Sequence, residues 1–300
     1  MWLTAALRAA GCQVTALATE PVPNADASYQ WLYGDLRDMA YVEHAVAQSR
    51  PDLVVHLAAI SHLPSAAADP AMAWDVNVTS TARLLDVLVR SRDAGAIDPT
   101  VLLIGSAEQY GRQLEAALPL AESAVQEPRT VYAATKAAQE ILALQVWRAS
   151  GLRVIVARSF NHSGRGQGTR FLLPALVSRA LALRDAPKGS PLIVGNTSPV
   201  RDYLHVSDVV AAYISLVRLG APGEAYNVAS GTGWSVAQVV DRVLARIGVA
   251  APIVVDPQLV RPVDVPVLVG DPLKLQHATG WRVTHSIDDI IDDLIHAATH

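Results

Sequence analysis

Residues 99–107 read PTVLLIGSA, and their unbroken run of Val, Leu and Ile is typical of a strand buried on both faces of a sheet. A long helical pattern lies on either side of this run, over residues 71–92 and 131–149. A second apolar run, LRVIVARSF, follows at 152–160. Strands that alternate with helices in this way predict an α/β fold with a doubly wound parallel sheet of the Rossmann type.

The N-terminal part of the chain continues the alternation, with one irregularity. Strand-like runs lie at 13–18, 29–36 and 51–59, with a helix near 39–48. The chain opens on a helical pattern at 2–10, closed by Gly11, and no strand precedes it. In the strand order 3-2-1-4-5-6 that first strand is central, so its neighbours would lie about 10 Å apart without it. We therefore expect the functional protein to carry about 15–20 further residues before Met1, forming a strand and a Gly-rich turn.

The alternation loosens beyond Gly164. A loop at 184–191 leads to a short strand at 192–196, and helical patterns follow at 207–220 and 235–248 around a strand at 225–230. We predict a dinucleotide-binding domain over 1–165, to which about 206–230 returns. We predict a smaller C-terminal α/β lobe, which binds substrate, over 166–300.

Composition excludes several classes of protein. The net charge of −4 gives no basic surface for nucleic acid. No apolar run reaches the ~18 residues of a membrane span, and the N-terminus lacks the pattern of a signal peptide. No histidine pair has the spacing of a metal site, and the single Cys12 is expected to be a small buried hydrophobe. We therefore expect a cytoplasmic protein without a metal.

The stretch VYAATKAAQE places Tyr132 and Lys136 four residues apart, on one face of a helix. An ammonium group beside a phenol lowers the pKa of the phenol, so Tyr132 is a candidate general acid or base. The same spacing also occurs in ordinary surface pairs. Ser106 ends the strand at 99–107, at the sheet edge where α/β proteins bind ligands, although it could instead cap the next segment. Together the three side chains predict chemistry on a substrate oxygen.

At these residues the chain resembles the extended short-chain dehydrogenase/reductases that act on nucleotide sugars. The resemblance assigns Ser106, Tyr132 and Lys136 to the family's catalytic trio. It implies that GDLRD contacts the adenine and that HLAAIS passes under the cofactor. The cofactor-binding residues implied are Asp35, Leu36, Leu57, Ala58, Ala59, Tyr132 and Lys136. DVNVTST at 75–81 resembles a helix start of the family.

Within that family the chain most resembles the GDP-4-keto-6-deoxy-mannose reductases and their 4,6-dehydratase relatives. Asn161 in RSFNHSGRGQG and Arg201 in SPVRDYLHVSDVVAAY match substrate segments, as do Arg261 and Asp264 in RPVDVPVLVGD. The resemblance implies that Asn161 and the two arginines bind the diphosphate and Asp264 the ribose. It implies that Glu108 orients the sugar. It also implies a homodimer built from the helices at 71–92 and 131–149, although the alanine-rich face AATKAAQEILA could equally pack against the sheet inside the monomer.

Two departures from the family pattern bear on function. Ala107 stands where the dehydratases have an acidic or hydroxylic residue, and it cannot protonate a leaving hydroxyl. The Gly-x-x-Gly-x-x-Gly turn is absent, so no phosphate-binding glycine can be assigned. The second strand ends ALATE, without a carboxylate for a ribose 2′-hydroxyl unless Glu20 supplies it, which favours NADP over NAD.

The sequence therefore predicts an NAD(P)-dependent reductase of the C4 ketone of a nucleotide-linked, preferably GDP-linked, 4-keto-6-deoxy-hexose. Tyr132 would act as the proton donor. An epimerase or 4,6-dehydratase of the same family is an alternative. A non-catalytic binding or regulatory homologue is a third reading, against which the intact Ser106, Tyr132 and Lys136 argue.

Overall fold

The computed structural model describes residues 2–22, 28–260 and 265–299. The chain divides into two compact units. The first unit consists of residues 1–109, 128–158 and 212–226, and the second of residues 110–127, 159–211 and 227–300. Each unit thus combines three separate stretches of sequence.

The first unit holds most of the long strands and the longest helix. Its elements are α1 (Trp2–Ala9), β1 (Thr15–Ala18), β2 (Gln30–Tyr33), α2 (Met39–Ser49), β3 (Leu53–His56), α3 (Leu63–Ala68), α4 (Pro70–Trp74), the π-helix η1 (Asp75–Thr79), α5 (Ser80–Asp93), β4 (Thr100–Ser106), the 3₁₀ turn η2 (Ala107–Tyr110), α6 (Val131–Ser150) and β5 (Arg153–Ser159). Two later elements, α8 (Val206–Leu219) and β9 (Ala225–Val228), have residues in both units, and the last residues of η2 and β5 belong to the second.

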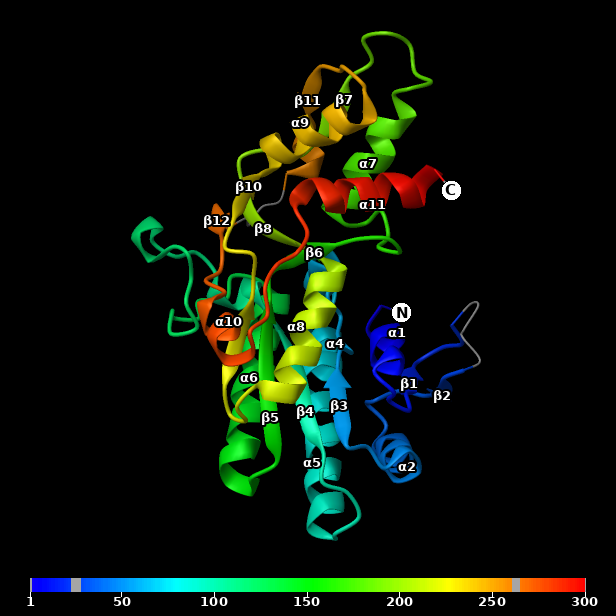
Figure 1. Ribbon diagram of the computed structural model, residues 1–300, viewed down its shortest axis with the longest axis vertical. Helices are drawn as coiled ribbons and strands as arrows, with labels where there is room; N and C mark the ends of the chain where they lie inside the picture. Colours follow the sequence, from blue (N-terminus) through cyan, green and yellow to red (C-terminus); the bar gives the residue numbers. More distant parts are fainter. Residues whose placement is uncertain (1, 23–27, 261–264, 300) are drawn as a thin grey trace. The chain divides into compact units, whose positions relative to one another are not determined.

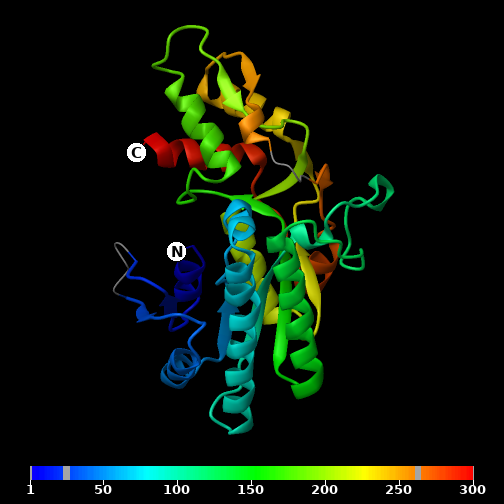
Figure 2. The same cartoon turned by 180° about the vertical axis from the view of Figure 1, so that it is seen from behind.

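The main sheet of the first unit has the strand order β3-β4-β5-β9. β3 and β4 are parallel, with Leu53 opposite Thr100 and His56 opposite Leu103. Helices α5 and α6 cover one face of this sheet and α8 lies on the other (Figures 1 and 2). Apolar side chains of β4, β5, α5 and α6 form the core between the sheet and its helices. The predicted Rossmann-type α/β fold is confirmed.

Strands β1 and β2 form a second, separate sheet. They pair in parallel, from Thr15 opposite Gln30 to Ala18 opposite Tyr33. In the part of the chain that the structure describes, no strand pairs with both β1 and β3. Figure 1 shows this pair with α1 and α2 beside the four-stranded sheet. The sheet of the first unit is therefore in two pieces, divided where the sequence led us to expect a gap.

The helix predicted over 71–92 is not one regular helix. It comprises α4, the π-helix η1 and α5. The side chain of Asp69 caps α4 by accepting a hydrogen bond from the backbone N–H of Met72, at 2.9 Å. The π-turn brings Asn77 into the buried interior, where its side chain finds polar partners. These partners come from distant segments, so the apolar pattern alone does not indicate the irregularity.

The second unit has smaller sheets and a helical core. Its elements are the 3₁₀ turn η3 (Glu115–Ala117), β6 (Asn161–Ser163), α7 (Leu172–Ala182), β7 (Leu192–Val194), β8 (Val200–His205), β10 (Gly233–Ser235), α9 (Val236–Ile247), β11 (Ile253–Val255), η4 (Pro257–Leu259), β12 (Val267–Leu268), α10 (Leu273–Thr279) and α11 (Ile287–Thr299). β8 pairs with β6, β10 and β12. Buried side chains of α7, α9 and α11 pack together as its apolar core.

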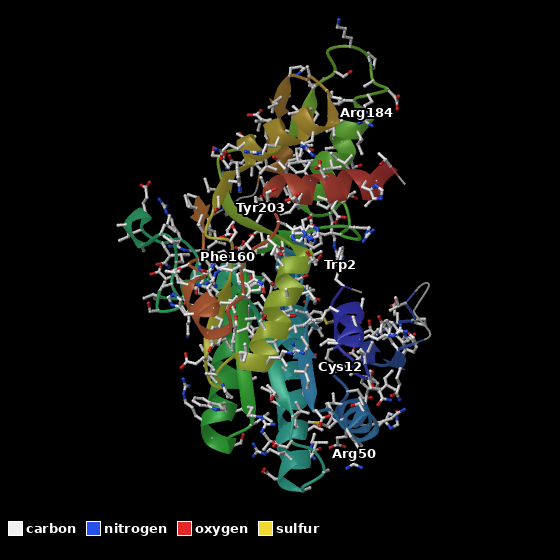
Figure 3. The ribbon with its side chains drawn as sticks, in the orientation of Figure 1. Trp2, Cys12, Arg50, Phe160, Arg184 and Tyr203 are labelled. Carbon is white, nitrogen blue, oxygen red and sulfur yellow. The ribbon has the colours of Figure 1, made fainter. Side chains whose placement is uncertain are left out.

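The expectation for Cys12 is wrong. Cys12 is exposed in the turn between α1 and β1 (Figure 3), where its N–H donates to the carbonyl of Leu7 at 3.0 Å. β1 begins only at Thr15, two residues after the predicted start at Gln13, so Cys12 is further from the strand than expected. Among the described residues, no helix is long and apolar enough to cross a bilayer. Nor do the described His, Cys, Asp and Glu side chains gather in a group of three or more that could hold a metal ion.

Buried His56 should make the fold sensitive to acid. Burial, together with the charge of Lys136, lowers the pKa of His56 to about 3. The folded protein holds His56 neutral, whereas the unfolded chain protonates it below pH 6.5. The folding free energy that depends on neutral His56 is therefore complete above pH 6.5 and is lost as the pH falls toward 3. Between pH 7 and pH 5 the loss should be about 2 kcal/mol of unfolding free energy.

Urea unfolding of the protein and of His56→Gln at both pH values measures this contribution. The glutamine amide can replace the imidazole N–H that faces the Thr81 hydroxyl at 2.8 Å, and it does not titrate. We expect a smaller pH dependence in the variant. An equal pH dependence in both proteins would exclude His56 as the source.

Candidate active site

The site is built where β4 ends and α6 begins. Ser106 is the last residue of β4 and is buried. Thr130 caps α6, since its side-chain oxygen accepts a hydrogen bond from the N–H of Ala133 at 3.1 Å. At the other end, Gly151 adopts the left-handed conformation that favours glycine and closes the helix. Local sequence signals thus define both ends of α6.

The structure brings the predicted trio together. Ser106 lies beside Tyr132, close enough for its side chain to act against the rise in the pKa of the phenol. Lys136 lies one turn further along α6, and its ammonium Nζ donates to the backbone carbonyl of Ile104 on β4 at 2.9 Å. Because Tyr132 and Lys136 share one helix face, this bond also turns Tyr132 toward the end of the strand.

The pKa of Tyr132 differs from the expectation. Burial raises it to about 12, the Ser106 side chain opposes that rise, and the charge of Glu108 adds to it. The expectation that Lys136 lowers the pKa of this phenol is therefore wrong for this structure. The lysine amine is bound to the Ile104 carbonyl, and the cost of burying a phenolate is the larger effect. Tyr132 is accordingly a neutral phenol at physiological pH and can donate a proton.

Lys136 is itself affected by its surroundings. Burial lowers its pKa from the ordinary 10.5 to about 8, because the interior disfavours the charged ammonium. Its proton is therefore partly lost in mildly alkaline solution. The site thus combines a tyrosine that retains its proton with a lysine that loses its proton easily.

Ala107 and Glu108 follow Ser106 in the turn η2. Ala107 is buried, whereas Glu108 is half-buried and its N–H donates to the Ser106 hydroxyl oxygen at 3.2 Å. The carboxylate of Glu108 lies close enough to Tyr132 for its charge to raise the pKa of the phenol. Of the two residues after Ser106, only Glu108 could exchange a proton with a ligand.

The residues predicted to contact the cofactor lie after β2 and β3. The carboxylate of Asp35 accepts hydrogen bonds from the backbone N–H and the guanidinium of Arg37, which lower its pKa. Leu36 follows it and is half-buried. After β3, Leu57 and Ala58 are exposed, and the Leu57 side chain retains 54% of its accessible surface. The neighbouring Ala59 is half-buried.

Sequence reasoning missed Asn77, which holds the segment after β3. Its side-chain oxygen accepts from the N–H of Ile60 at 2.7 Å, and its amide donates to the hydroxyl of Thr135 at 2.9 Å. Thr135 in turn donates to the backbone carbonyl of Tyr132 at 2.8 Å. Asn77 therefore links the segment after β3 to the first turn of α6. An asparagine within an otherwise apolar helical pattern is the signal that could have found it.

The predicted substrate residues belong to the second unit. Asn161 begins β6 and is exposed. Arg201 is buried on β8, and one guanidinium nitrogen donates to the carbonyls of Val200 and Val265, at 2.9 and 2.6 Å. Arg261 and Asp264 lie outside the described residues.

Residues 7–294 match the family model described as GDP-mannose 4,6 dehydratase. The chain belongs to the GDP-mannose 4,6-dehydratase family. The resemblance to the extended short-chain dehydrogenase/reductases of nucleotide sugars is thereby confirmed.

Members of known activity resemble the chain over most of its length. A GDP-6-deoxy-D-mannose reductase of Pseudomonas aeruginosa is 34% identical over 81% of this chain and 80% of its own. A GDP-6-deoxy-D-talose 4-dehydrogenase of Aggregatibacter actinomycetemcomitans is 30% identical over 87% of this chain and 84% of its own. A GDP-mannose 4,6-dehydratase of Sinorhizobium fredii is 26% identical over 88% and 79%.

Solved structures agree with the fold. The structure of RMD from Pseudomonas aeruginosa complexed with NADPH has a TM-score of 0.83 and 30% identity, and covers 99% of this chain and 96% of its own. The Thermus thermophilus UDP-glucose 4-epimerase complex with NAD has a TM-score of 0.86 and 27% identity, over 99% and 94%. These relatives support a nicotinamide cofactor and leave the choice between NAD and NADP open.

The described residues fit such a cofactor at two of its parts. The carboxyl ends of β2 and β3 present Asp35 and the exposed apolar Leu57, as an adenosine in the crevice at a sheet edge would require. Tyr132 lies at the carboxyl end of β4 and Lys136 beside the strand at Ile104, a pair suited to the nicotinamide riboside. In the described ranges, no glycine-rich turn joins a strand to a helix for the pyrophosphate.

The lowered pKa of Lys136 can be measured directly, since the chain has lysines only at positions 136, 188 and 274. Labelling with [ε-¹³C]lysine should give a carbon resonance that titrates near pH 8 and is missing in Lys136→Met. The spectrum of Lys274→Met serves as the control and should keep that resonance. Titration of the Lys136 resonance near its ordinary 10.5 would contradict the buried position of the amine.

Proposed function

We propose that the protein reduces the C4 ketone of a nucleotide-linked 4-keto-6-deoxy-hexose, with a GDP sugar favoured. The observation that carries this proposal is the arrangement at the end of β4, where Tyr132 of α6 lies beside Ser106 with its proton retained, and Lys136 follows on the same helix face. Reduction of a ketone requires such a donor, because the new alkoxide must be protonated. The GDP-6-deoxy-D-mannose reductase among the relatives supports the choice of substrate.

Each member of the trio has a separate task in this reaction. Ser106 donates a hydrogen bond to the ketone oxygen and orients the carbonyl. Tyr132 transfers its phenolic proton to the same oxygen as negative charge develops there. Lys136 holds the ribose next to the nicotinamide. The nicotinamide cofactor, when bound, supplies the hydride.

The nucleotide would be held by residues of the second unit. Asn161, Arg201 and Arg261 are proposed to bind the diphosphate, because guanidinium groups match paired phosphate oxygens. Asp264 is proposed to contact the ribose, and Glu108 to orient the sugar. We infer NADP as the cofactor, since β1 ends at Ala18 without a carboxylate there, and the RMD complex with NADPH supports this choice.

Dehydration of the sugar is disfavoured because buried Ala107 has no group that could protonate a leaving hydroxyl. An epimerase that regenerates its own cofactor is the second candidate, favoured by the likeness to the Thermus UDP-glucose 4-epimerase. The two functions differ in stoichiometry. A reductase consumes one NADPH for each product molecule, whereas an epimerase forms product without net consumption.

The first assay follows nicotinamide absorbance with NADPH and GDP-4-keto-6-deoxy-mannose, using NADH and a dTDP-linked ketosugar as comparisons. In this assay Tyr132→Phe should lower turnover by roughly 10²–10⁴-fold with substrate affinity retained, since only proton donation is lost. Tyr29→Phe, changed in the first unit outside α6, serves as the matched control. Unchanged turnover in Tyr132→Phe would remove Tyr132 from the mechanism, and product without NADPH oxidation would favour the epimerase.

We also propose a homodimer that pairs α5 and α6 of two copies. Ile141 lies in the middle of α6 with 66% of its surface exposed, which is unusual for a large apolar side chain. Ala134, Ala138 and Gln145 continue the same outward stripe at helical spacing, and the small alanines permit close approach of two helices.

Placing a charge on this stripe should separate the proposed dimer. Ile141→Glu would bury a carboxylate against the second copy, which is unfavourable without a partner charge. Sedimentation velocity should therefore find a dimer for the unmodified protein and a monomer for the variant, with Gln145→Glu at the edge of the stripe as the milder comparison. A monomer before any substitution would refute the proposal.

A further inference from the structure

The backbone of Ser106 is held by a side chain that the trio does not include. Its N–H donates to the side-chain oxygen Oε1 of Gln109 at 2.7 Å, within the turn that follows β4. Gln109 is fully buried, and Gly105 leaves the space that it occupies. A Cβ at position 105 would lie 2.7 Å from Oε1 of Gln109, too close for an ordinary contact. A glycine before Ser106 is therefore what admits the amide.

The other end of the Gln109 amide is bound to α6. Its nitrogen Nε2 donates to the carboxylate oxygen Oε2 of Glu140 at 2.9 Å. Glu140 follows Lys136 by four residues and Tyr132 by eight, so all three side chains share one face of the helix. Gln109 thus connects the backbone of Ser106 to the helix face that carries the other two members of the trio.

Arg158 on β5 fixes the orientation of this carboxylate. Its guanidinium forms a bidentate ion pair with Glu140. Nε donates to Oε2 at 2.9 Å, and a terminal nitrogen donates to Oε1 at 2.5 Å. The side chains of Arg158 and Glu140 are only 6% and 4% exposed. Paired hydrogen bonds define the plane of both groups, which a single bond or an apolar contact would not do.

A buried ion pair contributes little to stability compared with apolar side chains of the same size. Its effect here is on geometry. From Arg158 the contacts lead through Glu140 and Gln109 to the N–H of the residue whose hydroxyl meets Tyr132. Apolar residues could fill the volume of the ion pair, but they would leave the amide nitrogen Nε2 of Gln109 without its acceptor.

We propose that Gln109, Glu140 and Arg158 are positioning residues of the active site, which set the place of the Ser106 hydroxyl relative to Tyr132. They hold α6 to β4 one turn beyond the bond between Lys136 and Ile104. The catalytic consequence rests on the proposed reductase function. The geometric consequence, a fixed Ser106 backbone, does not.

The first test requires no substrate. Gln109→Met keeps the size of the side chain and removes both hydrogen bonds, so the Ser106 amide loses its acceptor. Amide hydrogen exchange, followed by NMR on the ¹⁵N-labelled chain, should be about tenfold or more faster at Ser106. Gln48→Met, an exposed glutamine of α2, is the matched control and should leave that rate unchanged. Unchanged exchange in Gln109→Met would overturn the proposal.

The second test separates positioning from stability. Glu140→Leu combined with Arg158→Leu replaces the ion pair by apolar side chains, so folding is retained while Gln109 loses its anchor. Both this double variant and Gln109→Met should lower kcat by about 10–100-fold and change KM by less than about threefold, because Ser106 is misplaced for the transition state. If the double variant does not fold, Gln109→Met decides alone.

The outcomes distinguish the two proposals. If Gln109→Met has the same kcat as the unmodified protein, the three residues have only a structural role. If the unmodified protein reduces no ketosugar, the proposed function fails, and the exchange rate at Ser106 still decides whether Gln109 and its partners position the backbone.

Discussion

The hydrogen bond from the Lys136 ammonium to the carbonyl of Ile104, 2.9 Å long, fixes how α6 is rotated against β4. A buried amine must find an acceptor, and the one that it finds belongs to a strand in the middle of the sheet. Once this contact sets the rotation of the helix, residues four positions away on either side face the end of the strand. Tyr132 thereby meets Ser106, and Glu140 meets Gln109.

The strand and the helix of the site were predictable from sequence because their signals are local. A continuous apolar run marks β4, while Thr130 and Gly151 mark the ends of α6. The pKa of Tyr132 was not predictable, since the spacing to Lys136 says nothing of burial or of the carbonyl that binds the amine. Asn77 was missed for a related reason, because its partners Ile60 and Thr135 are distant in the sequence.

The substrate residues depend more on family resemblance than on geometry. Arg201 belongs to a motif that the sequence shows. The sequence could not indicate, however, that one nitrogen of its guanidinium binds the carbonyls of Val200 and Val265. Such contacts fix the side chain and limit which of its donors remain for a phosphate. Asn161, by contrast, is exposed at the start of β6, as a ligand-binding amide would need to be. Spacing places residues along the chain, whereas their availability is decided by packing.

The π-helix η1 at Asp75–Thr79 inserts one extra residue into the helical stretch from α4 to α5. One residue corresponds to about 100° of rotation and 1.5 Å of rise in an α-helix. A single deletion there could yield a straighter and more regular helix while turning α4 away from its neighbours. Helical-wheel positions assigned on the assumption of a uniform helix would therefore be about 100° wrong for the residues of α4.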